Sequence, residues 1–196
     1  MQAFRHCAPL LIKTLKSILL SGYSNAAEYD FSGIVDPFLQ VKILKVLRIF
    51  AQDPSIVSAD ELNDILAQIA TNTDSSKNAG NAVLYECVQT IMAIPRADSG
   101  LRVLGVNILG KFLTNKDANI KYVALSMLHK VVQLDPKSVQ AKRAIVMECL
   151  RDSDLAIRRQ ALEVSYSLID AENVKALTKE LISFLVTAEA DFKNDL

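Results

Sequence analysis

The sequence has 196 residues, of which 51% are hydrophobic, and its 22 basic residues balance its 22 acidic residues. Only 6 residues are glycine and 5 are proline, which excludes a turn-rich β-sandwich or β-barrel because such folds need these residues where the chain reverses. Intrinsic disorder is excluded as well, since half of the chain is apolar and its net charge is zero.

Helical periodicity and terminus signals predict a series of helices along the whole chain. Gly22 ends the first of them, Asp36 and Asp135 each precede a proline at the first helical position, and Ser58 with Glu61 has the spacing of a capping box. In chain order, the predicted helices lie near 8–21, 36–51, 58–71, 77–94, 98–114, 117–133, 136–150, 153–169 and 173–187, with a short one from about 189.

These helices form an internal repeat. Asp36, Asp98, Asp117 and Asp154 are each followed by an aliphatic residue three positions later and by an apolar pair seven and eight positions later. An aspartate that caps a helix whose buried face begins three residues on explains this spacing. The helix starts alternate in two series with a period near 38 to 40 residues, which is typical of HEAT and armadillo arrays.

The repeat predicts an all-α fold, namely an α-solenoid of about five HEAT/armadillo-type helical pairs in one segment over 1–196. One longer spacing places an exposed loop at 23–35. The first and last helices lack the polar outer face of a capping repeat, so we expect the solenoid to be truncated at both ends and the first helix to expose apolar surface.

The sequence contains no convincing motif for catalysis, nucleotide binding or metal binding. Gly105 to Lys111 has the spacing of a phosphate-binding loop, but Phe112 stands where that motif has Ser or Thr, and an apolar helix with close-packed glycines explains it better. His6 and His129 lack neighbours that would complete a metal site. We therefore expect no enzyme and no catalytic, cofactor-binding or metal-binding residue.

The three cysteines, Cys7, Cys87 and Cys149, lie 80 and 62 residues apart. This spacing matches neither a metal motif nor a disulfide framework, so it indicates a reducing, intracellular environment.

The zero net charge conceals alternating blocks of +3 over 1–50, −5 over 51–100, +6 over 101–160 and −4 over 161–196. A basic block can face an acidic protein or an anionic membrane. The candidate partner-binding residues are the basic ones, Lys42, Lys45, Arg48, Lys121, Arg158 and Arg159.

A second interpretation of the basic residues is purely structural. Asp98 with Arg102, Asp117 with Lys121, and Asp154 with Arg158 have the four-residue spacing of ion pairs on a solvated helix face. Nucleic-acid binding is disfavoured because aromatic residues are few and acids interleave with the basic residues.

Five stretches are more specific than a generic helical repeat, namely GIVDPFLQVK at 33–42, NDILAQIATNT at 63–73, SKNAGNAVLYE at 76–86, GLRVL at 100–104 and NIKYVAL at 119–125. They resemble the middle part of the trunk in the adaptin large-chain family, and gamma-adaptins in particular. The resemblance extends over nearly the whole chain, from about Pro9 to Leu196.

The resemblance implies a non-enzymatic scaffold that assembles with a beta-type large chain and with the medium and small chains of a clathrin adaptor. It also implies recruitment of the assembled complex by an Arf-family GTPase and anionic phosphoinositides, with no nucleic acid, small-molecule substrate or cofactor involved. The implied location is cytoplasmic, peripheral on trans-Golgi and endosomal membranes and on clathrin-coated vesicles. The alternative is a generic HEAT-repeat adaptor or transport receptor without a coat role.

Overall fold

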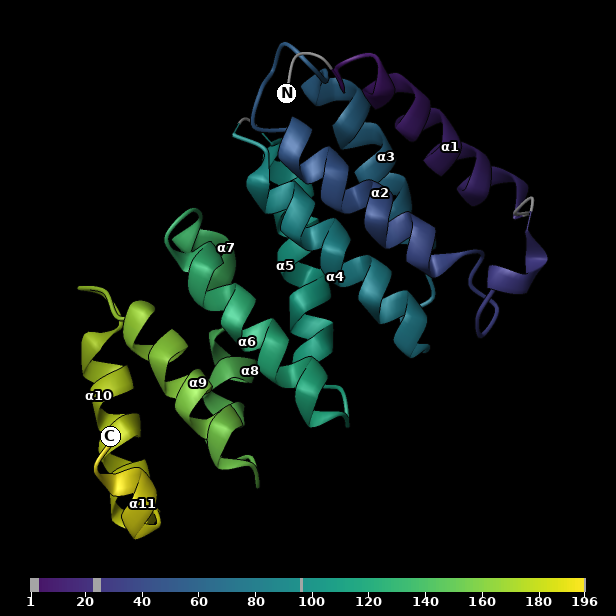
Figure 1. Cartoon of the computed structure of the whole chain (residues 1–196). Coiled ribbons are helices and arrows are strands. Elements are labelled where there is room, and N and C mark those ends of the chain that lie inside the picture. The colour runs from purple at the N-terminus through teal and green to yellow at the C-terminus, as the bar shows by residue number, and fades with distance from the viewer. Residues whose placement is uncertain (1–3, 23–25, 96, 196) are drawn as a thin grey trace. The chain divides into compact units, whose positions relative to one another are not determined.

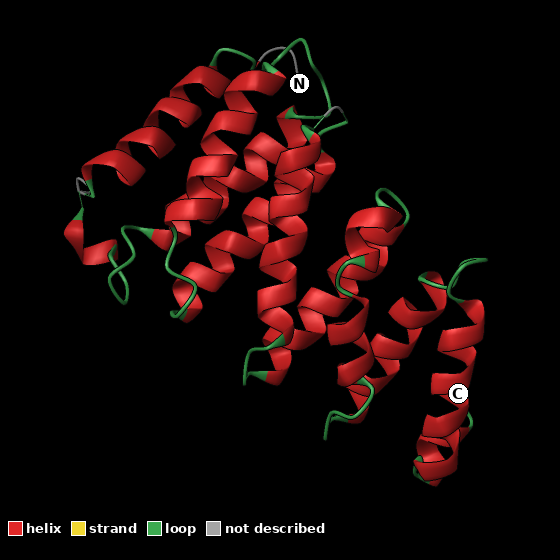
Figure 2. Ribbon diagram, turned by 180° about the vertical axis from the view of Figure 1, so that it is seen from behind, coloured by secondary structure: helices red, strands yellow, loops and turns green. Residues whose placement is uncertain are grey.

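The computed structural model describes residues 4–22, 26–95 and 97–195. These residues form helices joined by loops and no strand, apart from an isolated bridge between Phe31 and Ile34 (Figure 2). The all-α fold of HEAT-type helical pairs is thereby confirmed. The chain divides into two compact units, Met1–Ile108 and Leu109–Leu196, which are described separately.

The first unit contains two layers of helices. Within it, α2 packs against α4, α3 packs against α4, and α1 contacts both α2 and α3 (Figure 1). Leu44 and Leu47 of α2, and Ile65 and Leu66 of α3, are completely buried between these helices. The bounds are α1 Cys7–Ser21, the 3-10 turn η2 Ala27–Tyr29, α2 Pro37–Phe50, α3 Ala59–Asn72, α4 Asn78–Ala93, and α5 Ser99–Leu113, which continues past the end of this unit.

The second unit is also built from packed helices, of which α7, α8 and α11 are short. In it α6 packs against α7 and α9, and α8 packs against α9. Leu125 and Leu128 of α6 and Ile157 and Ala161 of α9 form its core. The bounds are α6 Ala118–Val132, α7 Pro136–Gln140, α8 Arg143–Cys149, α9 Leu155–Ser167, α10 Val174–Thr187 and α11 Ala190–Lys193.

The repeated aspartates act as the sequence predicts. The carboxylate of Asp36 accepts from the Leu39 backbone N–H, Asp117 from Asn119 and Asp154 from Ala156, at 2.8 to 3.0 Å, and Asp98 accepts from Gly100 N–H at 3.1 Å. Asp135 likewise caps α7 through the N–H of Ser138. The aspartates therefore fix the starts of the helices on which the repeat depends.

Two local predictions are wrong. Ser58 precedes α3 but its side chain makes no capping hydrogen bond. The helix predicted over 136–150 is divided into α7 and α8, because the chain tightens at Lys142, whose N–H bonds to the carbonyl of Val139 three residues earlier at 2.8 Å. Lys142 then lies over Gly110, where a Cβ would stand 3.1 Å from its Cδ.

The first helix exposes apolar side chains, as its wide apolar arc predicts. Leu10 is 62% exposed and Leu20 is 76% exposed, whereas Ile12, Leu15 and Ile18 of the same helix are buried. Gly22 ends α1 in the left-handed conformation, with φ 61°. Among the described residues, no helix combines the length and the apolar character that crossing a bilayer requires.

Candidate functional site

The exposed face of α2 carries both basic and apolar side chains. Lys42 and Lys45 are exposed, and neither makes an ion pair with a residue that the structure describes. Phe38 is 66% exposed and Ile49 is 54% exposed, with Val46 beside them. Spacings of three, four and seven residues place these side chains on one side of the helix. We call this set the α2 stripe, consisting of Phe38, Lys42, Lys45, Val46 and Ile49.

The α2 stripe has the composition of an interaction surface. Apolar side chains supply contact area, while unpaired lysines attract an acidic partner and select against a basic one. Tyr29 and Phe31 of the preceding loop are exposed as well. The loop is tied to the start of α2, because the Asp30 carboxylate accepts a hydrogen bond from the backbone N–H of Asp36 at 3.0 Å.

Arg48 does not belong to this surface, although the three-residue spacing places it in one row with Lys42 and Lys45. Three residues turn a helix by about 300°, so each step of the row moves roughly 60° around the axis. Arg48 consequently faces α4, where its guanidinium lies 2.9 Å from the Glu86 carboxylate and bonds to Gln89. Its role in the structure is to join α2 to α4.

Glu86 is the buried member of that ion pair, with 6% of its side chain exposed. Burial raises the pKa of this carboxyl above its ordinary value, and the positive charges of Arg48 and Lys45 oppose the increase. The Thr90 hydroxyl, also on α4, donates to the carbonyl of Leu44 on α2 at 3.2 Å. The contact between α2 and α4 therefore contains polar groups inside an apolar interface, where losing a partner is costly.

The basic candidates of the second unit are all ion-paired. Lys121 lies 2.6 Å from Asp152 and Arg158 lies 3.1 Å from Glu189. Arg159 lies 2.7 Å from Asp195. These partners come from other segments of the unit, so the predicted pairs of Lys121 with Asp117 and of Arg158 with Asp154 are wrong. The carboxylates of Asp117 and Asp154 cap their own helices instead.

The described surface has further recesses. An acidic groove of about 600 Å³ lies between α3 and α5 and is lined by Asp60, Asp64 and Asp98 over apolar Leu101. An apolar recess of about 330 Å³ is lined by residues that include Pro54, Leu62 and Pro95. Neither recess can be predicted from the sequence, because each is assembled from side chains of different segments.

The phosphate-loop spacing lies within a helix. Gly105 and Gly110 belong to α5, and a Cβ at Gly105 would stand 3.0 Å from the Met92 Cε of α4. The glycines thus permit close packing, as the apolar-helix interpretation predicts. Their backbone N–H groups lie inside a helix and cannot form the loop that cradles a phosphate.

The described residues contain neither a metal-binding cluster nor a cysteine in a reactive environment. No group of three or more His, Cys, Asp or Glu side chains is placed there to hold a metal ion. His129 Nδ1 lies 3.4 Å from the Ser167 hydroxyl. Cys87 and Cys149 are buried free thiols, and burial raises the pKa of both, that of Cys149 to about 11. A thiol with so high a pKa is a poor nucleophile at neutral pH.

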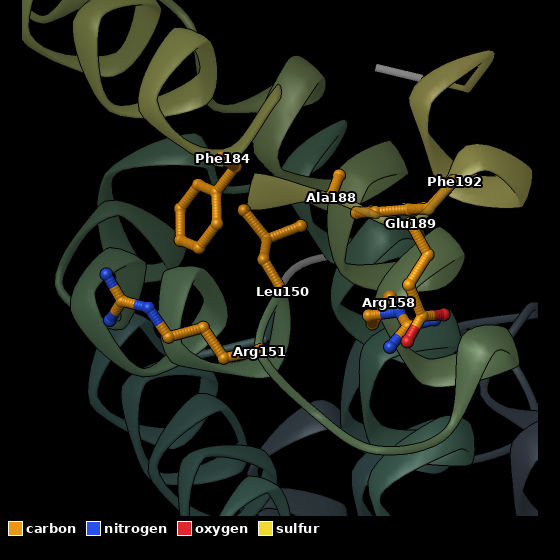
Figure 3. A pocket seen from close by; sticks show the side chains of 7 residues that line it. All are labelled: Leu150, Arg151, Arg158, Phe184, Ala188, Glu189 and Phe192. Carbon is orange, nitrogen blue, oxygen red and sulfur yellow. The ribbon is translucent and has the colours of Figure 1, made fainter. Parts of the chain in front are cut away.

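A third recess lies in the second unit and combines two arginines with two phenylalanines (Figure 3). Its volume is about 230 Å³. Arg151, Phe184 and Phe192 of this recess were not among the predicted partner-binding residues. The sequence indicates one part of the recess, because Arg151 and Arg158 are both basic and lie seven residues apart. Nothing in the sequence places Phe184 beside them.

Comparisons with known proteins identify the family. The family model described as "Adaptin N terminal region" matches residues 1–196. The chain is 54% identical over 192 residues to an AP-1 complex subunit gamma-2 of Arabidopsis thaliana and 52% identical over 194 residues to an AP-1 complex subunit gamma of Dictyostelium discoideum. It is 50% identical over 192 residues to an AP-1 complex subunit gamma-like 2 of Homo sapiens.

These three alignments each cover 98% of this chain, but only 21 to 24% of the relative. The chain thus spans about a fifth to a quarter of the length of the curated relatives it matches. The matching model describes the N-terminal region of adaptins, so the expected position in the middle part of the trunk is corrected to that region. With a match over its full length, the chain belongs to the family of the adaptin N-terminal region, and the relatives it matches are named as gamma subunits of the AP-1 complex.

Proposed function

We propose that this chain is a non-enzymatic scaffold segment of a clathrin adaptor large subunit. It would act by presenting a helical surface to the beta-type large chain and to the medium and small chains. The α2 stripe is the observation that carries the proposal, because it exposes Phe38 and Ile49 on either side of two lysines that make no ion pair with any described residue. The relatives named as AP-1 complex subunits support membership in a multi-subunit assembly.

The proposal extends to where the assembly acts. As part of an adaptor, the chain would serve vesicle-mediated protein transport between the trans-Golgi network and endosomes, peripheral on those membranes and on clathrin-coated vesicles. An Arf-family GTPase and anionic phosphoinositides would recruit the assembled complex. Of the six basic candidates, Lys42 and Lys45 are the ones we assign to partner contact, since Arg48, Lys121, Arg158 and Arg159 are engaged in ion pairs.

A generic HEAT-repeat transport receptor remains the alternative class. The identities of 50 to 54% to AP-1 gamma subunits favour the adaptor role. Such a receptor would bind its cargo as a single chain, whereas an adaptor segment requires its companion subunits. Assembly with those subunits therefore distinguishes the two functions.

Co-expression with the beta-type, medium and small adaptor chains tests the proposal. We expect the subunits to co-purify with the wild-type chain, and we expect the double substitution Lys42→Glu and Lys45→Glu to reduce their recovery at least about fivefold, because reversed charges repel an acidic partner. Lys175→Glu with Lys179→Glu is the matched control, since both lysines are exposed on one helix, α10. Absence of co-purification with the wild-type chain, or equal loss with both double variants, would contradict the proposal.

A further inference from the structure

The recess of the second unit is built from two arginine–phenylalanine pairs (Figure 3). The Arg158 guanidinium carbon lies 5.4 Å from the centre of the Phe192 ring, and that of Arg151 lies 4.8 Å from the centre of the Phe184 ring. A guanidinium held over an aromatic face keeps its N–H groups available for an anion at the edge. Leu150 lies between the two pairs as an apolar wall.

The first pair already holds an acidic residue. Glu189 reaches Arg158, with 3.1 Å between its Oε2 and the Arg158 Nη2. Glu189 is followed three residues later by Phe192, which is buried against the same arginine. The chain itself therefore shows which ligand this type of site accepts, namely a carboxylate with an apolar side chain close behind it.

The second pair lacks such an acid. Arg151 makes no ion pair with any residue in the described part of the chain, and its backbone lies just after α8, where the side chain is exposed. Arg158 also retains donor capacity, because its Nε is buried without a hydrogen-bond partner among the described residues. One arginine of the recess is thus paired with a carboxylate, and the other is available for a second one.

The charge and the size of the recess restrict the ligand. Two arginines and Glu189 leave a formal charge of +1, which one carboxylate neutralises, whereas a phosphate group brings about −1.5 to −2 and would be repelled by Glu189. The volume of about 230 Å³ is below the ~300 to 1,000 Å³ of drug-sized ligand pockets, so it suits a side chain. A flat lipid surface would not reach into such a recess.

We propose that this recess docks a peptide segment of a partner protein that carries an Asp or Glu followed within three residues by an apolar side chain. The carboxylate binds the Arg151 guanidinium, and the apolar side chain packs against the part of the Phe184 ring that remains exposed in the recess. This acidic–apolar site lies in the second unit, is separate from the α2 stripe of the first, and does not depend on the adaptor role proposed above.

Fluorescence anisotropy of the 196-residue chain with a labelled dodecapeptide tests the site. The peptide has Glu at position 5 and Leu at position 8 in a Gly/Ser background. We expect saturable binding that weakens about tenfold or more with Arg151→Gln, because a charge-assisted hydrogen bond is lost. Arg159→Gln is the matched control, since Arg159 is paired with Asp195 and does not line the recess; it should bind as the wild type does.

Substitutions in the peptide test the site without any change to the protein. Replacing its Glu by Gln, or its Leu by Ser, should each reduce binding by about tenfold. The proposal is overturned if the wild-type chain does not bind the peptide, if the Gln peptide binds equally, or if a phosphoserine peptide binds more tightly than the Glu peptide. Arg151-dependent binding to phosphatidylserine vesicles without peptide binding would assign the recess to membranes and also overturn it.

Discussion

Glu86 is a carboxylate buried between α2 and α4, and its pairing with Arg48 shows how a single residue holds two repeats together. Burial raises the pKa of Glu86, while Arg48 and Lys45 lower it. Because the pKa of Glu86 is higher in the folded chain than in the unfolded chain, this carboxyl makes the fold less stable as the pH rises. The free energy of unfolding falls between pH 4.5, the ordinary pKa, and the pKa in the folded chain. The positive charge of Arg48 reduces that loss.

Removing Arg48 should therefore destabilise the chain more at neutral than at acidic pH. We expect Arg48→Ala to lower the free energy of unfolding by about 1 to 3 kcal/mol at pH 7, because Glu86 keeps its burial and loses its partner. At pH 4 the carboxyl is largely protonated and the loss should be smaller. Urea titration at both pH values measures this. Lys42→Ala, on the exposed side of α2, should change stability by less than about 0.5 kcal/mol.

Asp152 has the opposite pH dependence. Burial works to raise the pKa of Asp152, but the hydrogen bonds from Lys121 and from the Asp154 N–H outweigh it, so the pKa lies below the ordinary 3.8. A depressed pKa gives stability that is present above pH 3.8 and is lost as the pH falls through the folded value.

Asp152→Asn should consequently destabilise the chain by about 1 kcal/mol at pH 7, where it breaks the contact with Lys121. As the pH falls through the folded pKa of Asp152, the wild type loses the same contribution, so the difference between the two proteins should narrow toward pH 2. Thermal unfolding followed by circular dichroism between pH 2 and pH 7 measures the difference. A constant gap across this range would show that Asp152 acts by packing and not by its charge.

At the scale of helices, the sequence predicted most of the structure because helix starts depend on neighbouring residues. Asp36, Asp117 and Asp154 cap their own helices, and the predicted bounds differ from the observed ones by two residues or fewer except where α7 and α8 divide. At that division the Lys142 side chain lies over Gly110. Because this contact joins residues 32 positions apart, no local pattern reveals it.

The glycines of α4 and α5 give a matched pair of substitutions. A Cβ at Gly80 would stand 1.9 Å from the backbone oxygen of Asp74, whereas one at Gly105 would meet only the flexible end of Met92 at 3.0 Å. We expect Gly80→Ala to destabilise the chain by about 2 kcal/mol or more, because backbone has to move. Gly105→Ala should change stability by less than about 1 kcal/mol, since Met92 can shift and alanine favours helix. Urea unfolding of both variants measures this, and equal losses would contradict the packing described for α4 and α5.

At the scale of the whole molecule, the sequence predicted the fold class but not which charged groups remain available to a partner. Four of the six basic candidates are engaged by carboxylates 31 to 38 residues away in the sequence. Such partners are set by which helices pack together, and a sequence pattern of four-residue spacing cannot anticipate them. The exposure of Phe38 and Ile49 beside Lys42 has the same origin, because it depends on which face of α2 the other helices leave open.

In an assembled adaptor, we expect the α2 stripe to contact companion subunits. Lysine acetylation footprinting of the chain alone and of the chain in the co-purified complex tests it most directly. We predict that Lys42 and Lys45 react when the chain is alone and lose most of that reactivity in the complex, while Lys175 and Lys179 of α10 keep theirs. Unchanged reactivity of Lys42 and Lys45 in the complex would contradict the account.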